Sequence, residues 1–230
     1  MMKKILIISL LLFANSLIFA QNIQLHRDFG EGRNYFTTTV EMFKPDKWGN
    51  TFFFVDMNYG AGDVKGVSVA YWEIARVIKL GELPVGFHAE YNGGVGQWKA
   101  DSLGGAYQID DAWLAGIDYS WNNDDFSKGF SIKPLYKYIE GKHDVSFQIT
   151  GVWYMYFFDR KFSFNGFADF WKEDNIFGAK TTEYVFLAEP QVWYNPFKHF
   201  SVGSEIEISN NFGSMEGFNV MPTLAVKWTF

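Results

Sequence analysis

Hydrophobic and polar residues alternate along this chain, and the alternation is clearest between residues 35 and 60. In a strand over residues 50–59, successive side chains would face opposite sides. One face would be wholly apolar, with Phe53, Val55, Met57 and Tyr59. The other would mix aromatic and polar side chains, with Phe52, Phe54, Asp56 and Asn58. Residues 35–44 also favour a strand, and Pro45 to Asn50 favour a turn, so the stretch from 35 to 60 is predicted to be one β-hairpin.

The same alternation predicts strands along the rest of the chain. Together with the hairpin, they cover residues 23–29, 35–44, 50–59, 66–78, 84–92, 113–120, 130–139, 145–157, 162–171, 184–194, 200–208 and 220–230. These are about twelve strands of roughly ten residues, the length of a tilted strand that spans a membrane. An amphipathic helix is the alternative for residues 72–83, but the flanking segments are all predicted strands, which favours a strand here too.

The connections between these strands differ in length between the two ends. At one end they are mostly long: 30–34, 60–65, 93–111, 140–143, 172–182 and 209–217. At the other end they are mostly short: 45–49, 79–83, 122–127, 158–160 and 195–198. This asymmetry is typical of outer-membrane barrels, and the aromatic final strand ending at Phe230 resembles their carboxy-terminal signal. The predicted fold class for residues 21–230 is therefore all-β, a single antiparallel up-and-down transmembrane β-barrel with about 12 strands.

The first 20 residues have the layout of a secretory signal peptide. Lys3 and Lys4 precede an apolar segment over residues 5–13, and Ala20 is a small residue at the expected cleavage point. A membrane anchor helix is the alternative, but it would need about 20 apolar residues. Cleavage would remove two lysines and leave 18 basic and 26 acidic residues, a net charge of −8. We therefore expect export to a bacterial outer membrane and no binding of nucleic acid.

Aromatic residues make up 20% of the chain, and cysteine is absent. Such enrichment fits a barrel whose aromatic rings lie at the two lipid boundaries. The residues expected there, near strand ends, are Trp48, Tyr59, Tyr91, Trp121, Trp171 and Trp228. Ordinary packing in a soluble barrel is the alternative for them. The absence of cysteine excludes thiolate catalysis and thiolate zinc sites.

Several blocks of the sequence resemble the nucleoside-specific channel-forming, Tsx-like outer-membrane porins. The hairpin TVEMFKPDKWGNTFFFVDMNYG (39–60) is similar to the WGD-x-FFF-x-D hairpin of that superfamily, with Asn50 in place of the usual acidic residue. Shorter blocks at 71–80, 114–121, 166–171 and 189–195 are similar too. The resemblance implies a twelve-stranded barrel with a narrow lumen that admits nucleosides, in a compact branch of the superfamily.

If the apolar faces meet lipid, the polar faces define the lumen. The residues expected to point inward and to contact a solute are Glu41, Phe52, Phe54, Asp56, His88, Glu90, Asp118, Lys133, Lys137, Glu189, Gln191, Trp193, Glu205, Glu207 and Lys227. For each of them the alternative role is to pair across the lumen and brace the barrel. Inward rings beside carboxylates and amides suit a planar, neutral, polar solute such as a nucleoside. Nucleotides should be poor solutes, because an acidic lumen repels phosphate.

Catalytic and metal-binding motifs find little support. The histidines His26, His88, His143 and His199 are scattered, and the chain has no G-x-S-x-G, H-E-x-x-H or glycine-rich phosphate loop. His88 and Glu90 share a strand face and could orient an imidazole as in a hydrolase, but no nucleophile is marked, so hydrogen bonding in the lumen is expected. Metal binding by His88, Glu90 and Asp56 has no supporting spacing. No enzymatic activity, metal or cofactor is therefore expected.

The function predicted from the sequence is a passive outer-membrane channel for small polar solutes, with nucleosides foremost. The first alternative is a non-conducting outer-membrane barrel that binds a small ligand or has a structural role. A soluble lipocalin-like barrel and an outer-membrane lipid hydrolase are the remaining alternatives. The expected partners are outer-membrane lipid and the solutes themselves. A monomer is expected, because a closed barrel has no free strand edge that requires a partner.

Overall fold

The computed structural model describes residues 20–142 and 144–230. Its strands are β1 (Ala20–Asp28), β2 (Phe36–Asp46), β3 (Gly49–Tyr59), β4 (Val67–Lys79), β5 (Val85–Ala100), β6 (Leu103–Asn122), β7 (Lys128–Ile139), β8 (Ser146–Phe157), β9 (Phe162–Phe177), β10 (Lys180–Ala188), β11 (Gln191–Tyr194), β12 (Phe200–Asn210) and β13 (Phe218–Thr229). Within the described residues, no helix has the length and apolar character needed to cross a membrane. The predicted signal peptide lies outside the described residues except for Ala20, and so does His143.

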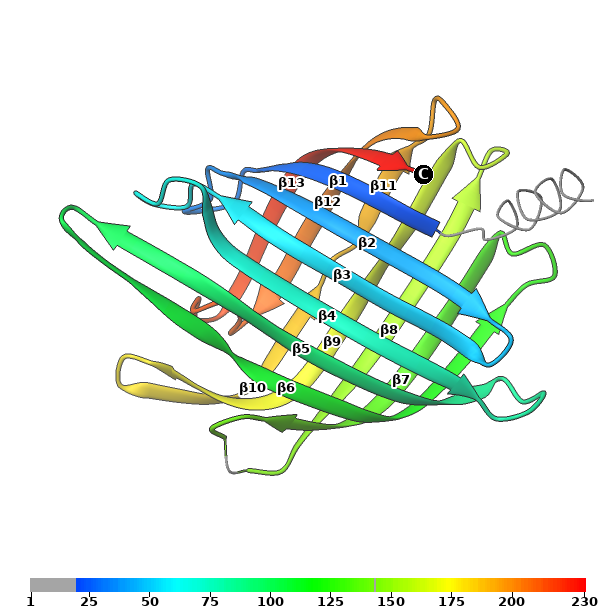
Figure 1. Cartoon of the computed structure of the whole chain (residues 1–230), viewed down its shortest axis with the longest axis horizontal. Helices are drawn as coiled ribbons and strands as arrows, with labels where there is room; N and C mark the ends of the chain where they lie inside the picture. The colour runs from blue at the N-terminus through cyan, green and yellow to red at the C-terminus, as the bar shows by residue number, and fades with distance from the viewer. Residues whose placement is uncertain (1–19, 143) are drawn as a thin grey trace, which may run out of the picture.

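The strands form one closed antiparallel barrel, as predicted (Figure 1). Strands β1 to β10 pair in chain order, β12 pairs with β13, and β13 pairs with β1 from Asn22↔Thr229 to Asp28↔Thr223, which closes the sheet. β10 and β11 both lie between β9 and β12. The 13 strands therefore occupy twelve positions around the barrel. Residues 72–79 belong to β4, which pairs with β3 and β5, so the strand prediction for this segment is confirmed.

The predicted strand over residues 184–194 is broken where β10 ends and β11 begins. Pro190 has no backbone N–H to donate to a neighbouring strand. Backbone hydrogen bonds hold the break to both neighbouring strands. Glu189 N donates to Phe167 O on β9, and Pro190 O accepts from Ile206 N on β12. Gly166 on β9 permits this path, because a Cβ there would lie 2.4 Å from Glu189 O.

Two segments predicted as long loops are instead strand hairpins that extend past their neighbours. Residues 93–111 form the ends of β5 and β6, and residues 172–182 form the ends of β9 and β10 (Figure 1). The prediction of loops was wrong. Residues 93–96 still pair with β4, whereas residues 97–109 and 172–182 pair only within their own hairpin, where no lipid face imposes alternation. Glycines in the first hairpin also suggested a loop. Gly96 has a packing role instead, since a Cβ there would lie 2.2 Å from the ring of Tyr107.

The hairpins and the longer connections lie at one end of the barrel, which we call the loop end; the opposite end is the turn end. At the loop end the connections are 29–35, 60–66, 101–102, 140–145, 178–179 and 211–217. At the turn end they are 47–48, 80–84, 123–127, 158–161 and 195–199. Most connections at the loop end are therefore longer than those at the turn end, as predicted, and at the other positions of the loop end β5–β6 and β9–β10 continue as hairpins.

The two faces of the barrel wall differ sharply in polarity. Outward-facing side chains are large, apolar and exposed, including Ile23, Leu25, Phe87, Ile117, Ile132, Ile149, Val192 and Leu224. The buried polar side chains, apart from Ser68, belong to the inner face, including Gln24, His88, Asp118 and Gln148. Trp171 is predicted to lie at a lipid boundary, and this prediction is wrong. It is 6% exposed and packs inside the barrel with Val185 and Leu187, because its position on β9 belongs to the inner set.

Candidate functional site in the barrel lumen

All residues predicted to point inward lie on the inner wall. The register shows this, because directly paired residues share a face: Glu41 pairs with Phe54, His88 with Gly116, and Gln191 with Glu205. The same pairing places inward Phe52, Asp56, Glu90, Asp118, Lys133, Lys137, Trp193, Glu207 and Lys227. Glu189, between β10 and β11, lines the cavity in the lumen. None of these side chains belongs to an exposed residue. Their role as solute contacts stays a prediction.

The loop-end half of the lumen contains a cavity of about 790 Å³, which we call the cup. Its walls come from the inner faces of the strands, and its rim from residues 31–33, 107–110 and 211–215. Ten of the lining side chains are Asp or Glu, and two, Arg33 and Lys137, are Arg or Lys. The cup is therefore strongly acidic, and anions are expected to be disfavoured within it.

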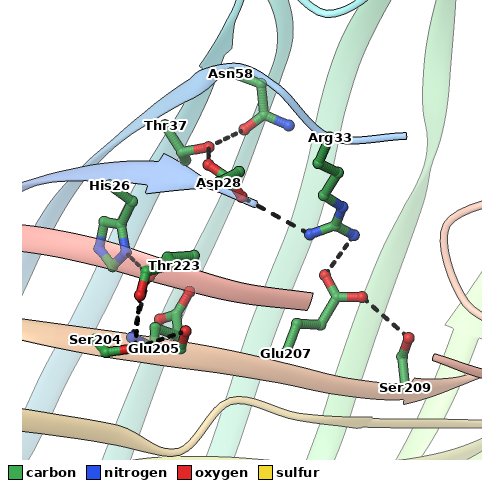
Figure 2. A network of polar contacts seen from close by, with 10 residues as sticks. All are labelled: His26, Asp28, Arg33, Thr37, Asn58, Ser204, Glu205, Glu207, Ser209 and Thr223. Carbon is green, nitrogen blue, oxygen red and sulfur yellow. Dashed lines mark hydrogen bonds and ion pairs between the residues drawn. The ribbon is translucent and has the colours of Figure 1, made fainter. Parts of the chain in front are cut away.

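Arg33 connects the β1–β2 loop to the inner wall, as Figure 2 shows. Its Nη2 donates to Glu207 Oε2 on β12 at 2.6 Å, and its Nη1 lies 3.9 Å from Asp28 Oδ1 on β1. Ser209 Oγ donates to the other oxygen of Glu207 at 3.0 Å. Thr37 Oγ1 lies 3.0 Å from Asp28 Oδ2, which adds a contact from β2. The loop is thus held across the mouth of the cup by charged and polar contacts.

A second group of contacts lies deeper, where β1 meets β13 (Figure 2). His26 Nδ1 is 3.1 Å from Thr223 Oγ1, and its Nε2 is 3.0 Å from Gln24 Oε1. Thr223 Oγ1 in turn accepts from the backbone N of Glu205 at 3.1 Å. The Glu205 carboxylate accepts from Gln191 Nε2 at 2.5 Å. These contacts fix His26 and Glu205, which both line the cup.

Below the cup, packed side chains fill the middle of the barrel. Trp193 is 0% exposed, and its indole N–H donates to Gln191 Oε1 at 2.9 Å. The His26 ring meets it edge-on at 6.1 Å between centroids. Lys227 Nζ lies 4.0 Å from the centroid of the indole ring, a cation–π contact. His88 on β5 is also 0% exposed, and we call these buried side chains the middle layer.

The wall formed by β5 to β8 carries mixed charges. His88 Nε2 lies 2.8 Å from Glu90 Oε2, so the pair expected from the sequence is in contact. Lys133 Nζ is 3.8 Å from Asp118 Oδ2. Lys137 Nζ donates to Gln148 Oε1 at 2.8 Å and lies 4.3 Å from the centroid of the Trp171 ring. The charge pairs and the hydrogen bond lie within one strand or between adjacent strands, and the bracing of the barrel across the lumen stays a prediction.

The β12–β13 loop narrows the mouth of the cup. Residues 211–215 line the cavity, and Phe212 meets Trp171 edge-on at 6.0 Å between ring centroids. The ion pair between Lys180 Nζ and Glu216 Oε1, at 2.6 Å, connects this loop to the β9–β10 hairpin. Asn175 Nδ2 adds a bond to Asn211 O at 3.4 Å.

Sequence reasoning missed several residues that line the cup: His26, Asp28, Arg33, Glu73, Asn92 and Asp169. His26 and Asp28 alternate with Ile23 and Leu25, so a period-two pattern on the first strand could have found them. Arg33 belongs to a loop, where no periodicity applies. Glu73 lies between Trp72 and Ile74 and could have been found by the same alternation.

Among the described residues, no group of three or more His, Asp or Glu side chains is arranged to hold a metal ion. Asp56, His88 and Glu90 therefore do not form such a site. The chemistry available in the lumen is hydrogen bonding, ion pairing and contact with aromatic rings. This arrangement suits reversible binding of a polar solute.

A closed antiparallel barrel with a polar interior and an apolar exterior defines the class of transmembrane β-barrels. Residues 20–230 match the family described as a domain of unknown function, DUF5020, and the chain belongs to this family. A search of curated proteins finds no match.

Solved structures show the same fold at low sequence identity. NanC porin is 10% identical, with a TM-score of 0.58, over 92% of this chain and 100% of that chain. KdgM porin in complex with disordered oligogalacturonate is 10% identical, with a TM-score of 0.51, over 91% of this chain and 99% of that chain. KdgM porin in a further structure is 12% identical, with the same TM-score and coverage. The fold is therefore that of small porins.

Proposed function

We propose that this protein is an outer-membrane channel through which small polar solutes diffuse passively. The observation that carries the proposal is the cup, a polar cavity of about 790 Å³ inside a barrel whose outer face is apolar. With the loop end outside the cell, solutes would enter the cup first. Passage to the turn end would then require side chains of the middle layer, above all Trp193, to move aside. Outer-membrane lipid would surround a monomeric barrel.

Nucleosides are the solutes we propose first. Phe54 and Tyr71 line the cup with ring centroids 6.0 Å apart, a surface on which a planar base can stack. Carboxylates of Asp56 and Glu189 lie in the same cavity and can accept hydrogen bonds from ribose hydroxyls. The acidic lining should exclude the phosphate of a nucleotide. The resemblance of the β2–β3 hairpin to Tsx-like channels supports the same solute class.

Single-channel conductance of the refolded chain in a planar bilayer, with nucleosides titrated in, tests this proposal. Discrete conductance that nucleosides block is the expected result. Conductance without block would retain the channel and reject nucleosides as its solutes. Liposome flux of a nucleoside and its monophosphate adds a second check, because equal rates would contradict exclusion by the acidic lining.

One observation favours a second function, a non-conducting barrel that binds a small ligand. The side chains of the middle layer are nearly inaccessible to water: Trp193 and His88 are 0% exposed, and His26 and Gln24 are 2% exposed. A correctly folded and inserted barrel that shows no conductance, yet binds a solute at the loop end, would establish this function in place of the channel.

A further inference from the structure

We infer that the cup contains a subsite for the protonated amine of a small polar solute, formed by Glu73 of β4, Asn92 of β5 and Asp169 of β9. The inference rests on the proposed function, because it names a solute class for the same cavity. It extends that function beyond neutral nucleosides to amine-bearing solutes such as amino sugars and diamines.

The three side chains face one cavity from two walls. Glu73 and Asn92 are directly paired residues on β4 and β5, so their side chains lie next to each other on the inner face. Asp169 comes from β9 and lines the same cavity. Glu73 and Asp169 are close enough to interact electrostatically across the lumen. Tyr71 orients Glu73, since its hydroxyl donates to Oε1 at 2.7 Å.

Unpartnered acceptor atoms provide an independent indication of a ligand. Asn92 is 5% exposed, and its Oδ1 has no hydrogen-bond partner. Asp169 Oδ1 is also buried without a partner. The Asn92 amide oxygen and an ionised Asp169 carboxylate accept hydrogen bonds and cannot donate them. Because buried acceptors are almost always paired, these atoms indicate a donor that a bound solute would supply.

The charge around these atoms favours a cationic donor. Within the described chain, no Lys, Arg or His nitrogen lies within 4.0 Å of a carboxylate oxygen of Glu73 or Asp169. Lys137 is a cation on a neighbouring part of the wall, but its Nζ is engaged by Gln148 Oε1 and the Trp171 ring. Lys133 also interacts electrostatically with Asp169, although its Nζ lies nearest Asp118. Two lysines thus face the five carboxylates of Glu73, Glu90, Asp118, Asp169 and Glu173, which leaves negative charge uncompensated in the cup.

A primary ammonium matches this arrangement better than a hydroxyl does. It carries three N–H donors, which can serve Asn92 Oδ1, Asp169 Oδ1 and a carboxylate oxygen of Glu73 together. Hydrogen bonds between charged groups are also stronger than neutral ones. The neighbouring rings of Tyr71 and Phe54 can add a cation–π contact. A neutral hydroxyl offers one donor and no charge.

Glucosamine and glucose test the inference, because they differ at one position by an ammonium in place of a hydroxyl. Binding of each sugar to the refolded barrel in detergent would be measured by calorimetry or saturation-transfer NMR. We expect glucosamine to bind about tenfold or more tightly than glucose. Equal affinities would overturn the inference.

Variants then locate the site. Glu73→Gln and Asp169→Asn keep the shape of each side chain and should weaken glucosamine binding by roughly ten- to a hundredfold, with glucose binding unchanged. Glu31→Gln is the matched control, since Glu31 lines the same cavity from the β1–β2 loop. Equal losses in Glu31→Gln and Glu73→Gln would show a diffuse effect of acidic charge and overturn the local site. Heat-dependent gel migration verifies that each variant is folded.

Flux separates this inference from the proposed channel. Detergent binding does not require conduction, whereas entry of the two sugars into liposomes does. Preferential binding of glucosamine without flux would retain the subsite and reject the channel. Flux of both sugars at equal rates, with equal binding, would retain the channel and reject the subsite.

Discussion

Arg33 of the β1–β2 loop and Glu207 of β12 are 174 positions apart in the chain and form an ion pair inside the lumen, with Nη2 2.6 Å from Oε2. Their side chains are 18% and 8% exposed, so neither charge is fully hydrated. Ser209 and Asp28 complete the surroundings of the pair. The contact fixes the β1–β2 loop to β12, across the β1–β13 pairing that closes the barrel. Its loss should therefore affect both the stability of the barrel and the charge at the mouth of the cup.

Removal of Arg33 should destabilise the barrel. Arg33→Met would leave the carboxylates of Glu207 and Asp28 without their cation, and we expect a loss of up to about 3 kcal/mol in the free energy of unfolding. Urea unfolding in detergent, followed by tryptophan fluorescence, measures it. The double variant Arg33→Met/Glu207→Gln should lose less than the sum of the single variants, because no unpaired charge remains at Glu207. Additive losses would show that the two side chains are not energetically coupled.

Gly116 should tolerate no side chain, because β6 and β7 approach closely there. A Cβ at Gly116 would lie 2.2 Å from Pro134 O and 3.0 Å from Leu135 Cα, both backbone atoms that cannot move aside cheaply. We expect Gly116→Ala to destabilise the barrel by about 1–3 kcal/mol. Gly151→Ala is the control, since its nearest neighbour would be Ala168 O at 3.9 Å. Similar unfolding midpoints for the two variants would contradict this account.

The faces of the strands could be predicted from the sequence, because alternation with period two is a local property. Phe54 and Asp56 lie on the inner face for this reason. Partners across the lumen could not be predicted. His26 meets Trp193 because β1 closes on β13, beside β12 and β11, and that arrangement depends on the register of the whole sheet. Loop residues such as Arg33 carry no periodic signal at all.

The hairpin ends were missed for a related reason. Alternation is imposed where one face meets an apolar surrounding and the other faces the lumen, and it disappears where both faces meet water. Residues 172–177 continue β9 beyond the barrel wall with a mostly polar sequence, which reads as a loop. The prediction that Trp171, just before them, lies at a lipid boundary rests on its aromatic ring and its place near a strand end, and neither gives the direction of the side chain.

Trp193 should control passage through the middle of the barrel. It is fully buried between His26 and Lys227, so Trp193→Ala removes the largest side chain of the layer. We expect a higher single-channel conductance, together with a loss of about 3–5 kcal/mol in stability from the cavity left behind. Trp228→Ala is the control, because Trp228 faces outward and stacks on His199. An unchanged conductance in folded Trp193→Ala would show that the layer does not limit ion flow.

The contact between Lys180 and Glu216 should hold the β12–β13 loop over the cup in a pH-dependent way. The hydrogen bond to the Glu216 carboxylate raises the pKa of Lys180 above its ordinary value of about 10.4. A raised lysine pKa means that the contact is fully formed below the ordinary value and is lost as pH rises through the raised one. Both side chains are largely exposed, at 72% and 46%, so we expect a modest effect that salt weakens.

A spin label at Ser214→Cys can report the mobility of this loop, since the chain contains no other cysteine. The label should remain restrained from about pH 6 to pH 9 and become more mobile above about pH 10.5. Glu216→Gln should give the mobile spectrum throughout, because the amide offers Lys180 no charge. Asp63→Asn, in the β3–β4 loop, removes one acidic charge from the same end of the barrel and should leave the spectrum unchanged. Equal mobility of the label in Glu216→Gln and in the parent protein would contradict this role of the ion pair. The contacts of Phe212 and Asn211 would then hold the loop.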